Sequence, residues 1–388
     1  MNPTSSIRRS TTPNHRAPFV VPTPAPIDPS AACPFRHAAA ASVRIGEREI
    51  TPESPTYIIA EAGVNHDGDL NTAKALIEAA HEVGADAIKF QCFVADRLVD
   101  IHTPQCAYQQ TNAPDASQHA MLKRLELSID DFAALKAHAR HVGIEFFATP
   151  FGLVELSGLV GLGVRMLKIA SPDIVNVPLL DAAAASGLPV ILSTGAADET
   201  EVDAAVARFD RVGAHDRLIL LHCVSSYPTP LSGARLRCIN TLRNRHQIPA
   251  GFSDHTVEIE TAALAVAAGA VVLEKHLTLN RTCSGPDHFF SLEPGDFGRY
   301  VAAARSAHAA LGEGDLVATP DQREVQMLAR GSIVAARAIP AGTCLSPEWL
   351  AVRRPGTGMS PLLWDSVIGR TTRTGIPAGT ALSPEMLR

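Results

Sequence analysis

The chain has 388 residues, with 34 Lys or Arg, 40 Asp or Glu and a net charge of −6 at pH 7. This balance offers no basic field for nucleic acid and no polybasic patch for a membrane surface. Hydrophobic residues make up 46%, which suits a large core, yet no apolar run approaches the roughly 20 residues that a membrane helix needs. We therefore expect neither a nucleic-acid nor a membrane partner. Small anionic substrates are compatible, because a few lysines in a cleft suffice to bind them.

The N-terminal segment and the cysteines indicate the cellular setting. Residues 1–41 are rich in Pro, Ala, Ser, Thr and Arg, and such a stretch buries too little apolar area to offset its ordering entropy. We expect a disordered tail without the apolar region of a secretory signal. The seven cysteines are scattered, odd in number and free of CxxC spacing. They predict reduced thiols in the cytoplasm rather than disulfides or a structural zinc site.

Eight apolar, strand-like runs follow, and each ends near a polar residue and precedes a helix-like segment. The runs are TYIIAE, AIKFQ, FFATP, MLKIAS, VILS, LILLHCVSS, GFSDH and VLEKH. The helices are expected at residues 71–83, 128–142, 153–162, 177–186, 198–209, 236–246, 258–268 and 294–310. Eight such units predict an α/β fold, a (β/α)8 or TIM barrel, whose active site forms at the carboxyl ends of the strands.

The predicted barrel occupies residues 42–311 and has two further features. Residues 43–50 alternate weakly between apolar and polar, and they predict a small hairpin that closes the barrel floor. The connection between Cys92 and Leu127 is unusually long. On a barrel such a loop lies over the active-site mouth and is often functional.

The C-terminal part contains an internal repeat. Residues 312–330 are expected to be a linker, and residues 331–388 a compact module. Within that module, IPAGTCLSPE at 339–348 recurs as IPAGTALSPE at 376–385. Two copies with Pro and Gly turns predict a small, pseudo-symmetric and mostly β domain.

Two lysines interrupt apolar strands. Lys89 and Lys168 lie in AIKFQ and LKIAS, where a charge is costly without an anionic partner. Hydroxyl side chains end neighbouring strands, namely Thr149, Ser171, Ser193 and Ser253. Together they predict a phosphate or carboxylate pocket. The alternative is one salt bridge from each lysine to a buried acid.

A pair of histidines predicts a metal site. His255 and His276 end two consecutive strands, and adjacent strands lie about 4.8 Å apart, so imidazoles at matching heights could share one ion. Two histidines without a nearby cysteine suit Mn²⁺, Mg²⁺ or Co²⁺ with several waters, rather than a closed zinc site. The alternative for either residue alone is a hydrogen-bonded core histidine, as we expect for His222.

Carboxylates complete the candidate site. Glu61 ends the first strand and is a candidate general acid or base, or a carboxylate that activates water. Its alternative is a salt bridge at the barrel mouth. Glu274 and Asp287 are weaker candidates for holding polar substrate groups. The turn at residues 65–68 is explained mainly as the entry to a helix.

These motifs, in this order, resemble the N-acetylneuraminate (sialic acid) synthase family. The matching segments are IIAEAGVNHDGDL, GADAIKFQ, FFATPF, LKIAS, ILSTG, LLHCVSSYPTP, GFSDHT, LEKHLTL, SGPDH and VRRPGTGMSP, and the similarity covers about residues 57–388. The C-terminal module is similar to the antifreeze-like (SAF, β-clip) domain that these enzymes share with type III antifreeze proteins.

The resemblance implies condensation of phosphoenolpyruvate with open-chain N-acetylmannosamine and water, giving N-acetylneuraminate and phosphate with C–O cleavage. It implies that Glu61 moves protons or orients water. It also implies phosphoenolpyruvate contacts from Lys89, Thr149, Lys168, Ser171, Ser193 and Ser253, a divalent metal (Mn²⁺ first, then Mg²⁺ or Co²⁺) on His255 and His276, and sugar contacts from Gln91, Tyr227, Asp287 and Arg354. Arg354 would reach into a second subunit, so a domain-swapped homodimer is expected.

Two departures from the family pattern bear on the substrate. Ser225 and the sequence Ser171-Pro172-Asp173 differ from the residues that are common in sialic-acid-making relatives. The same chemistry on another acylamino hexose, as in legionaminic or pseudaminic acid synthases, is therefore an alternative. A non-catalytic carbohydrate-binding protein is a third hypothesis, but such a protein would have little physical reason to keep costly buried lysines.

Overall fold

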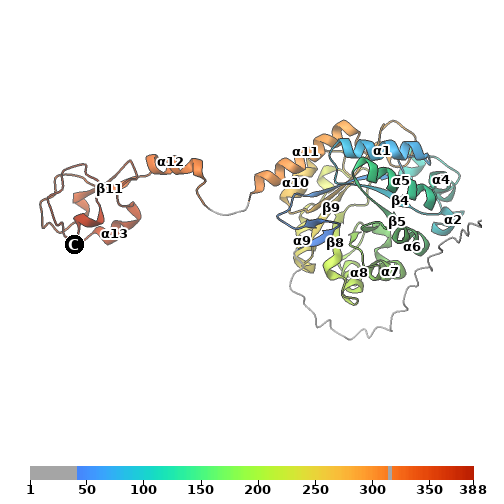
Figure 1. Cartoon of the computed structure of the whole chain (residues 1–388), viewed down its shortest axis with the longest axis horizontal. Coiled ribbons are helices and arrows are strands. Elements are labelled where there is room, and N and C mark those ends of the chain that lie inside the picture. The colour runs from blue at the N-terminus through green and yellow to red at the C-terminus, as the bar shows by residue number, and fades with distance from the viewer. Residues whose placement is uncertain (1–41, 313–316) are drawn as a thin grey trace, which may run out of the picture. The chain divides into compact units, whose positions relative to one another are not determined.

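The computed structural model describes residues 42–312 and 317–388, which belong to two compact units that divide after Gly312 (Figure 1). The tail predicted for residues 1–41 lies outside the described residues. Among the described helices, none is long and apolar enough to cross a membrane.

The first unit is a closed barrel of eight parallel strands. They are β3 (Tyr57–Gly63), β4 (Ala87–Cys92), β5 (Glu145–Pro150), β6 (Leu167–Ile169), β7 (Val190–Ser193), β8 (Leu218–Cys223), β9 (Ala250–Asp254) and β10 (Val272–His276). The hydrogen-bonded order is β5-β4-β3-β10-β9-β8-β7-β6, and β5 and β6 at its two ends are also neighbours. The predicted TIM barrel is confirmed. Two strands end earlier than predicted, so Ser171 begins a short 3-10 helix after β6 and Ser225 lies in the loop after β8.

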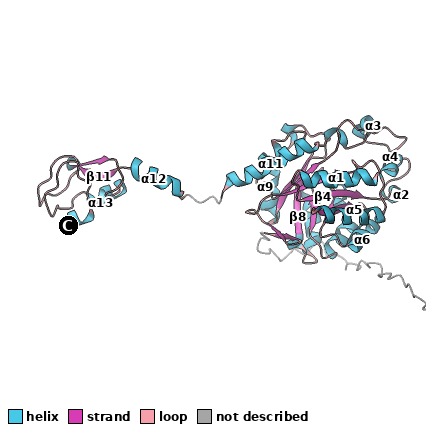
Figure 2. Ribbon diagram, turned by 45° about the horizontal axis from the view of Figure 1, so that its top comes forward, coloured by secondary structure: helices cyan, strands magenta, loops and turns pink. Residues whose placement is uncertain are grey.

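Helices surround the strands (Figure 2). The eight predicted ones are α1 (Leu70–Glu82), α5 (Ile129–Val142), α6 (Leu153–Leu162), α7 (Val177–Ala185), α8 (Glu199–Asp210), α9 (Arg237–His246), α10 (Thr261–Ala267) and α11 (Pro294–Leu311). Local chemistry sets their ends. Ser128 and Asp198 form capping boxes before α5 and α8, and Gly143 and Gly163 end α5 and α6 in the left-handed conformation.

The barrel floor is apolar and closed, as predicted. The hairpin of β1 (Val43–Ile45) and β2 (Arg48–Ile50) buries Val43, Ile45 and Ile50 against inward-facing side chains of the barrel strands. The polar inward-facing residues are therefore confined to the opposite, carboxyl end of the strands.

The long connection between β4 and α5 contains three short helices, α2 (Ala95–Leu98), α3 (Ala107–Asn112) and α4 (Gln118–Leu125). A small apolar cluster that includes Val64 and Met121 holds this connection to the barrel. Gly68 has a φ of +76°, and a Cβ there would lie 2.4 Å from the carbonyl oxygen of Arg124. Glycine at this position therefore allows the turn after β3 to pack directly against α4.

The second unit contains α12 (Pro320–Ala329), β11 (Ser332–Ala335), β12 (Leu350–Arg353) and α13 (Trp364–Val367). The two repeat copies meet in its core, where Ile339 and Ile376 exchange backbone hydrogen bonds of 2.8 Å. Helix α12 occupies residues that the sequence predicted to be a linker. Thr319 and Pro320 start this helix as a capping-box residue and a first-turn proline, signals that the polar composition obscured.

Candidate active site

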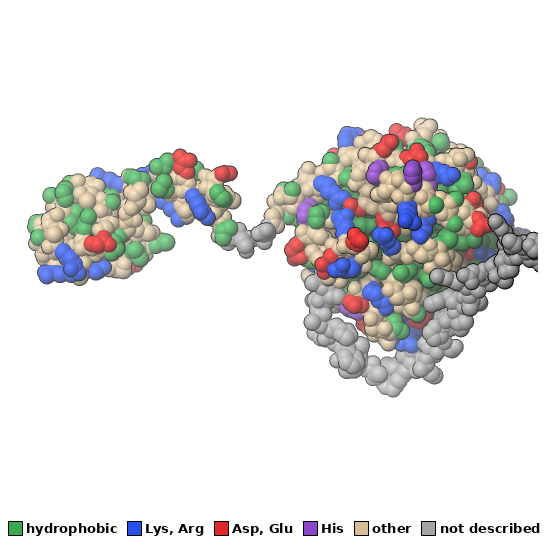
Figure 3. Space-filling view, in the orientation of Figure 1, with side chains coloured by type: hydrophobic (Ala, Val, Ile, Leu, Met, Phe, Trp, Pro, Cys, Tyr) green, Lys and Arg blue, Asp and Glu red, His purple; other side chains and the backbone are tan. Residues whose placement is uncertain are grey.

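A pocket of 340 Å³ lies at the carboxyl ends of the barrel strands. Every site residue predicted within the barrel lines it, except Asp287: Glu61, Lys89, Gln91, Thr149, Lys168, Ser171, Ser193, Tyr227, Ser253, His255 and His276. On the face of this unit that Figure 3 shows, side chains of both charge signs are interspersed. The pocket, by contrast, gathers several ionisable side chains in one place.

Strand alternation explains why these residues converge. Ile59 belongs to the inner cluster of the barrel floor, and Glu61 follows it by two residues on β3. On β10, Val272 belongs to the same cluster, and Glu274 and His276 follow at the same spacing. Since side chains two residues apart share a face, each inward row changes from apolar at the floor to polar at the mouth.

The two lysines form ion pairs with two glutamates. Lys89 Nζ lies 2.8 Å from Glu61 Oε2 and 3.3 Å from Glu274 Oε2, and Lys168 Nζ lies 3.5 Å from Glu274 Oε1. All four residues are at most 4% exposed. The salt-bridge alternative considered for each lysine is thus the observed arrangement. The ion-pair distance is longer at Lys168 than at Lys89, so the Lys168 side chain can move more easily from Glu274 to a bound anion.

Burial and neighbouring charges shift the pKa values of the two glutamates in opposite directions. Burial raises the pKa of Glu61 to about 7, although Lys89 opposes this rise. Burial also opposes ionisation of Glu274, but Lys168 and Lys89 outweigh it and lower its pKa to about 2. Near neutral pH, Glu274 is therefore ionised and Glu61 titrates. The two glutamates outweigh burial and raise the pKa of Lys89, whereas burial lowers the pKa of Lys168. The cluster has positive charge available for an anion, and Glu61 is the group that can exchange a proton.

Hydroxyl groups surround the lysines. Lys89 Nζ donates to Thr149 Oγ1 at 3.2 Å, Ser253 Oγ donates to Glu274 Oε1 at 2.9 Å, and Ser171 Oγ accepts from the Gly195 N–H at 2.9 Å. Ser193 Oγ is buried and has no hydrogen-bond partner within the described part of the chain. An unsatisfied buried hydroxyl costs about 1–3 kcal/mol, so this group is best explained by a partner that enters the pocket.

The two histidines lie side by side, with ring centroids 5.6 Å apart. Their equal height follows from the register, because the preceding residues, Lys275 and Asp254, are paired on β10 and β9. His255 Nδ1 donates to the Val224 carbonyl at 2.8 Å, which leaves Nε2 as the nitrogen available to a metal, and His276 Nδ1 is buried without a hydrogen-bond partner in the described residues. Burial and the neighbouring His255 hold the pKa of His276 well below its usual value, so this ring is neutral, the form that binds a metal.

These donors fit an open metal site. Residues 42–312 and 317–388 contain no group of three or more His, Cys, Asp or Glu that could hold a metal by themselves. Two imidazoles with remaining positions for water or substrate oxygen suit a hard divalent ion better than structural zinc. One premise of the prediction was wrong, because Cys223 Sγ lies 3.8 Å from His255 Nδ1. Cys223 also lines the pocket, but the nitrogen that it approaches already bonds the Val224 carbonyl, so Nε2 is the nitrogen left for a metal.

Aromatic side chains pack around the histidines, and two of them, Tyr227 and Tyr108, line the pocket. The Tyr227 ring lies 4.4 Å from that of His255 and 5.0 Å from that of Tyr108, and the Phe290 ring lies 4.7 Å from that of His276. Tyr108 belongs to α3, in the long connection. The sequence indicated that this connection would cover the site, but not which of its residues would do so.

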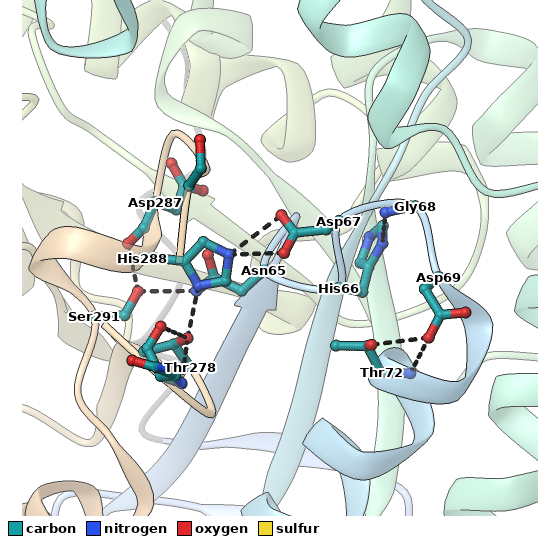
Figure 4. A network of polar contacts seen from close by, with 12 residues as sticks. Asn65, His66, Asp67, Gly68, Asp69, Thr72, Thr278, Asp287, His288 and Ser291 are labelled. Atoms are coloured by element: carbon teal, nitrogen blue, oxygen red, sulfur yellow. Dashed lines mark hydrogen bonds and ion pairs between the residues drawn. The ribbon is translucent and has the colours of Figure 1, made fainter. Parts of the chain in front are cut away.

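Asp287 is held beside the pocket by a hydrogen-bond network that is buried except at Asp67 (Figure 4). Ser291 Oγ donates to the Asp287 carbonyl at 2.6 Å, and Asn65 Nδ2 donates to Ser291 Oγ and to the Leu277 carbonyl, both at 2.9 Å. His288 bridges Thr278 Oγ1 at 2.7 Å and an Asp67 oxygen at 3.1 Å. The turn at residues 65–68, predicted mainly to start a helix, thus also fixes the segment that carries Asp287.

One residue of the site, Glu274, was given too small a role in the prediction from the sequence, and another residue, Lys275, was not identified. Glu274, predicted only as a weak sugar contact, lies between both lysines. Its position two residues before His276 was the available signal. Lys275 was not singled out, yet its Nζ lies 3.1 Å from Asp254 Oδ2, and both side chains are buried. This pair links the residues that immediately precede His276 and His255.

Arg354 lies in the second unit, directly after β12, and is exposed.

Comparisons with known proteins agree with this geometry. Residues 76–316 match the NeuB family and residues 330–388 the SAF domain. The chain is 43% identical to N,N'-diacetyllegionaminic acid synthase of Legionella pneumophila, covering 81% of this chain and 89% of the relative. It is 38% identical to the enzyme of the same name from Campylobacter jejuni, covering 81% and 95%. The crystal structure of N-acetylneuraminic acid synthetase from Leptospira borgpetersenii has a TM-score of 0.66 and 38% identity, covering 75% of this chain and 96% of that one.

Proposed function

The chain belongs to the NeuB family, and from this premise we propose that it is a phosphoenolpyruvate-dependent nonulosonate synthase. The reaction joins phosphoenolpyruvate, the aldehyde of an acylamino hexose and water into a nine-carbon 2-keto acid and phosphate. The observation that carries the proposal is that the two sides of the pocket differ in their chemistry. Buried lysines and an unpaired hydroxyl lie on one side, and paired imidazoles with an aromatic wall lie on the other.

The acceptor in this proposal is a 2,4-diacetamido hexose, which would make the protein a legionaminic acid synthase. Two relatives named N,N'-diacetyllegionaminic acid synthase, at 43% and 38% identity, support this choice. N-acetylmannosamine, the acceptor expected from the sequence motifs, is the second candidate. The likeness to an N-acetylneuraminic acid synthetase structure supports it.

In this scheme, Lys89 and Lys168 provide standing positive charge for the phosphate and carboxylate of phosphoenolpyruvate. The hydroxyls of Thr149, Ser171, Ser193 and Ser253 donate hydrogen bonds to the same oxygens. Because Lys168 contacts Glu274 only at 3.5 Å, a substrate oxygen can replace that contact at small cost. A proton taken up by Glu61 would add to the positive balance when the anion binds.

The chemistry proceeds by carbon–carbon bond formation and then loss of phosphate. C3 of phosphoenolpyruvate attacks the aldehyde carbon, and the aldehyde oxygen gains a proton. Water adds to the electron-poor C2 and loses a proton, and the C2–O bond to phosphate then breaks with its electron pair on phosphate. Glu61, protonated when the anion binds, gives its proton to the aldehyde oxygen and then takes one from the attacking water, which suits a carboxyl group with a pKa near 7.

His255 and His276 would hold a divalent ion, Mn²⁺ first and Mg²⁺ or Co²⁺ as alternatives. When bound there, such an ion stabilises negative charge that develops on an aldehyde oxygen. Gln91, Tyr227 and Asp287 would contact the sugar. Because Cys223 outweighs burial and raises the pKa of His255, metal binding should release a proton from this residue.

The assembly in this proposal is a domain-swapped homodimer in the cytoplasm, in which Arg354 contacts the sugar bound to the other subunit. The exposure of Arg354 is compatible with such a role. A non-catalytic sugar-binding protein is less well supported, because it would not need two charged lysines at 3% exposure.

The test is phosphate release from phosphoenolpyruvate with each of the two sugars, in Mn²⁺ or in EDTA, followed by the mass of the product. We expect metal-dependent phosphate release and a product mass equal to the sugar plus pyruvic acid, with the diacetamido hexose preferred. Preference for N-acetylmannosamine would keep the chemistry and change the acceptor. No consumption of phosphoenolpyruvate with either sugar would refute the proposed function.

A further inference from the structure

A side pocket of 110 Å³ adjoins the main pocket next to His276. Gln91, Tyr227 and His276 line both pockets, whereas Val64 and Met121 line only the smaller one. None of the lysines or serines of the anion cluster borders the side pocket. It therefore opens from the histidine side of the site, where the sugar is proposed to bind, and not from the phosphate side.

Its size suits a small substituent. A water molecule occupies about 30 Å³ in the liquid, and an apolar cavity of about 150 Å³ holds a benzene molecule. A space of 110 Å³ thus exceeds one water and is too small for a second sugar ring.

The walls are of two chemical kinds. Val64 and Met121 are buried and apolar, and Leu122 continues this wall to the rim, where it also lines the main pocket. Gln91 and Asp287, with the Tyr227 ring, provide polar groups on the other walls. An acetamido group has the same two characters, because its methyl is apolar and its amide both donates and accepts hydrogen bonds.

The walls are held in place by the network in Figure 4. Val64 directly precedes Asn65, whose amide donates to Ser291 Oγ at 2.9 Å, and Ser291 in turn donates to the Asp287 carbonyl at 2.6 Å. One short chain of hydrogen bonds therefore fixes two walls relative to each other.

The third wall, α4, is anchored to the same turn. Gly68 approaches the Arg124 carbonyl too closely for any side chain, and Gln105 Nε2 lies 3.1 Å from Met121 Sδ. The shape of the side pocket is thus set by packed and hydrogen-bonded elements, which is what discrimination between related ligands requires.

We propose that the side pocket binds a second acetamido group of the acceptor and so selects a diacetamido hexose over N-acetylmannosamine. This inference rests on the proposed function and deepens it. It assigns acceptor choice to Val64, Met121 and Leu122, outside the groups proposed to bind phosphoenolpyruvate and metal.

The test compares Val64→Phe with a matched control, Val99→Phe. Both substitutions add a ring, but Val99 lines only the main pocket. Each Mn²⁺-loaded protein is measured for kcat/KM with both sugars, for KM of phosphoenolpyruvate, and for calorimetric binding of each sugar. Because Val64 is buried, Leu122→Trp at the half-buried rim serves as the second variant, and thermal unfolding checks all three.

We expect Val64→Phe to lower kcat/KM for the diacetamido hexose about tenfold or more, the scale at which pockets exclude a small group. For N-acetylmannosamine and for KM of phosphoenolpyruvate we expect less than about threefold change. Val99→Phe should affect both sugars alike. Leu122→Trp should reproduce the selective loss if Val64→Phe does not fold.

Equal losses for both sugars in the folded side-pocket variants would overturn the inference, as would a wild-type preference for N-acetylmannosamine. Failure of the proposed function looks different: wild-type protein would turn over neither sugar. Calorimetry then decides the inference separately. If the wild-type protein binds the diacetamido hexose selectively and the side-pocket variants do not, the inference is supported. If the wild-type protein shows no such selective binding, the inference is overturned.

Discussion

At the scale of single residues, the site depends on charges that are buried only because they are paired. Lys89 contacts two carboxylates and a hydroxyl within 3.3 Å. Glu61 and Glu274 have opposite pKa shifts although both are buried, because Glu274 faces both lysines and Glu61 chiefly one. A change at Lys89 therefore alters the charge balance at the anion side, and it also removes one of the positive charges that lower the pKa of His276.

We predict that Lys89→Met folds but loses activity. Removal of the ammonium takes away charge that would bind phosphoenolpyruvate, so kcat/KM for this substrate should fall about 100-fold or more. Steady-state kinetics with circular dichroism measures this. Lys136→Met, on α5 outside the barrel, is the control and should retain activity. Wild-type kinetics in Lys89→Met would show that the anion does not bind at this lysine.

His66, in the turn after β3, predicts a pH dependence of stability. Burial lowers its pKa to about 4, although Asp67 and Asp69 oppose this. Its Nδ1 accepts from the Gly68 N–H at 3.1 Å, and its ring packs 6.0 Å from Phe90. The folded protein thus keeps His66 neutral, while the unfolded chain takes up a proton near pH 6.5.

The stabilising effect of a neutral His66 is therefore complete above pH 6.5 and is lost as the pH falls towards 4. The loss should reach about 3 kcal/mol. Urea unfolding of wild type and His66→Asn at several pH values measures the difference, in which other titrating groups cancel. The wild-type advantage should shrink between pH 7 and 4. A constant difference would contradict the assigned shift.

At the scale of elements, sequence periodicity predicted the strands and helices, because these depend on the local pattern of residues. The strand ending at Glu61 and the helix at 153–162 follow from apolar runs, caps and glycines. Contacts between distant segments were not predictable in the same way. The approach of Cys223 to His255 arises only because β8 and β9 are neighbours in register. The position of Tyr108 depends on how the long connection folds, for which a single sequence offers no periodic signal.

The register of β9 and β10 leads to a prediction about the pair behind the histidines. Lys275 also donates to the Thr256 carbonyl, and Thr261 Oγ1 donates to Asp254 Oδ2 at 2.6 Å. Lys275→Met would leave the buried Asp254 carboxylate without its cation and should destabilise the protein by about 3–5 kcal/mol. In the double variant, Asp254→Asn also removes the carboxylate charge, so much of the lost stability should be recovered. Chemical unfolding of both variants measures this. A double variant no more stable than Lys275→Met would contradict the account.

At the scale of the whole molecule, the barrel supplies every proposed site residue except Arg354, which belongs to the second unit. Arg353 and Arg354 are adjacent and both exposed, so they form a matched pair. Arg354→Ala should raise KM for the sugar about tenfold or more, the effect of losing a charged hydrogen bond, and leave KM for phosphoenolpyruvate unchanged. Arg353→Ala should change neither. Equal effects of the two substitutions would remove Arg354 from the sugar site.

The central claim is that this barrel condenses phosphoenolpyruvate with an acylamino hexose through cleavage of the C–O bond. Its most direct test uses phosphoenolpyruvate labelled with ¹⁸O at the oxygen between C2 and phosphorus, with Mn²⁺ and the diacetamido hexose, and mass spectrometry of both products. We predict a nine-carbon acid without the label and phosphate that carries it. Label retained in the sugar acid, or phosphoenolpyruvate left unconsumed by the folded protein, would contradict the account.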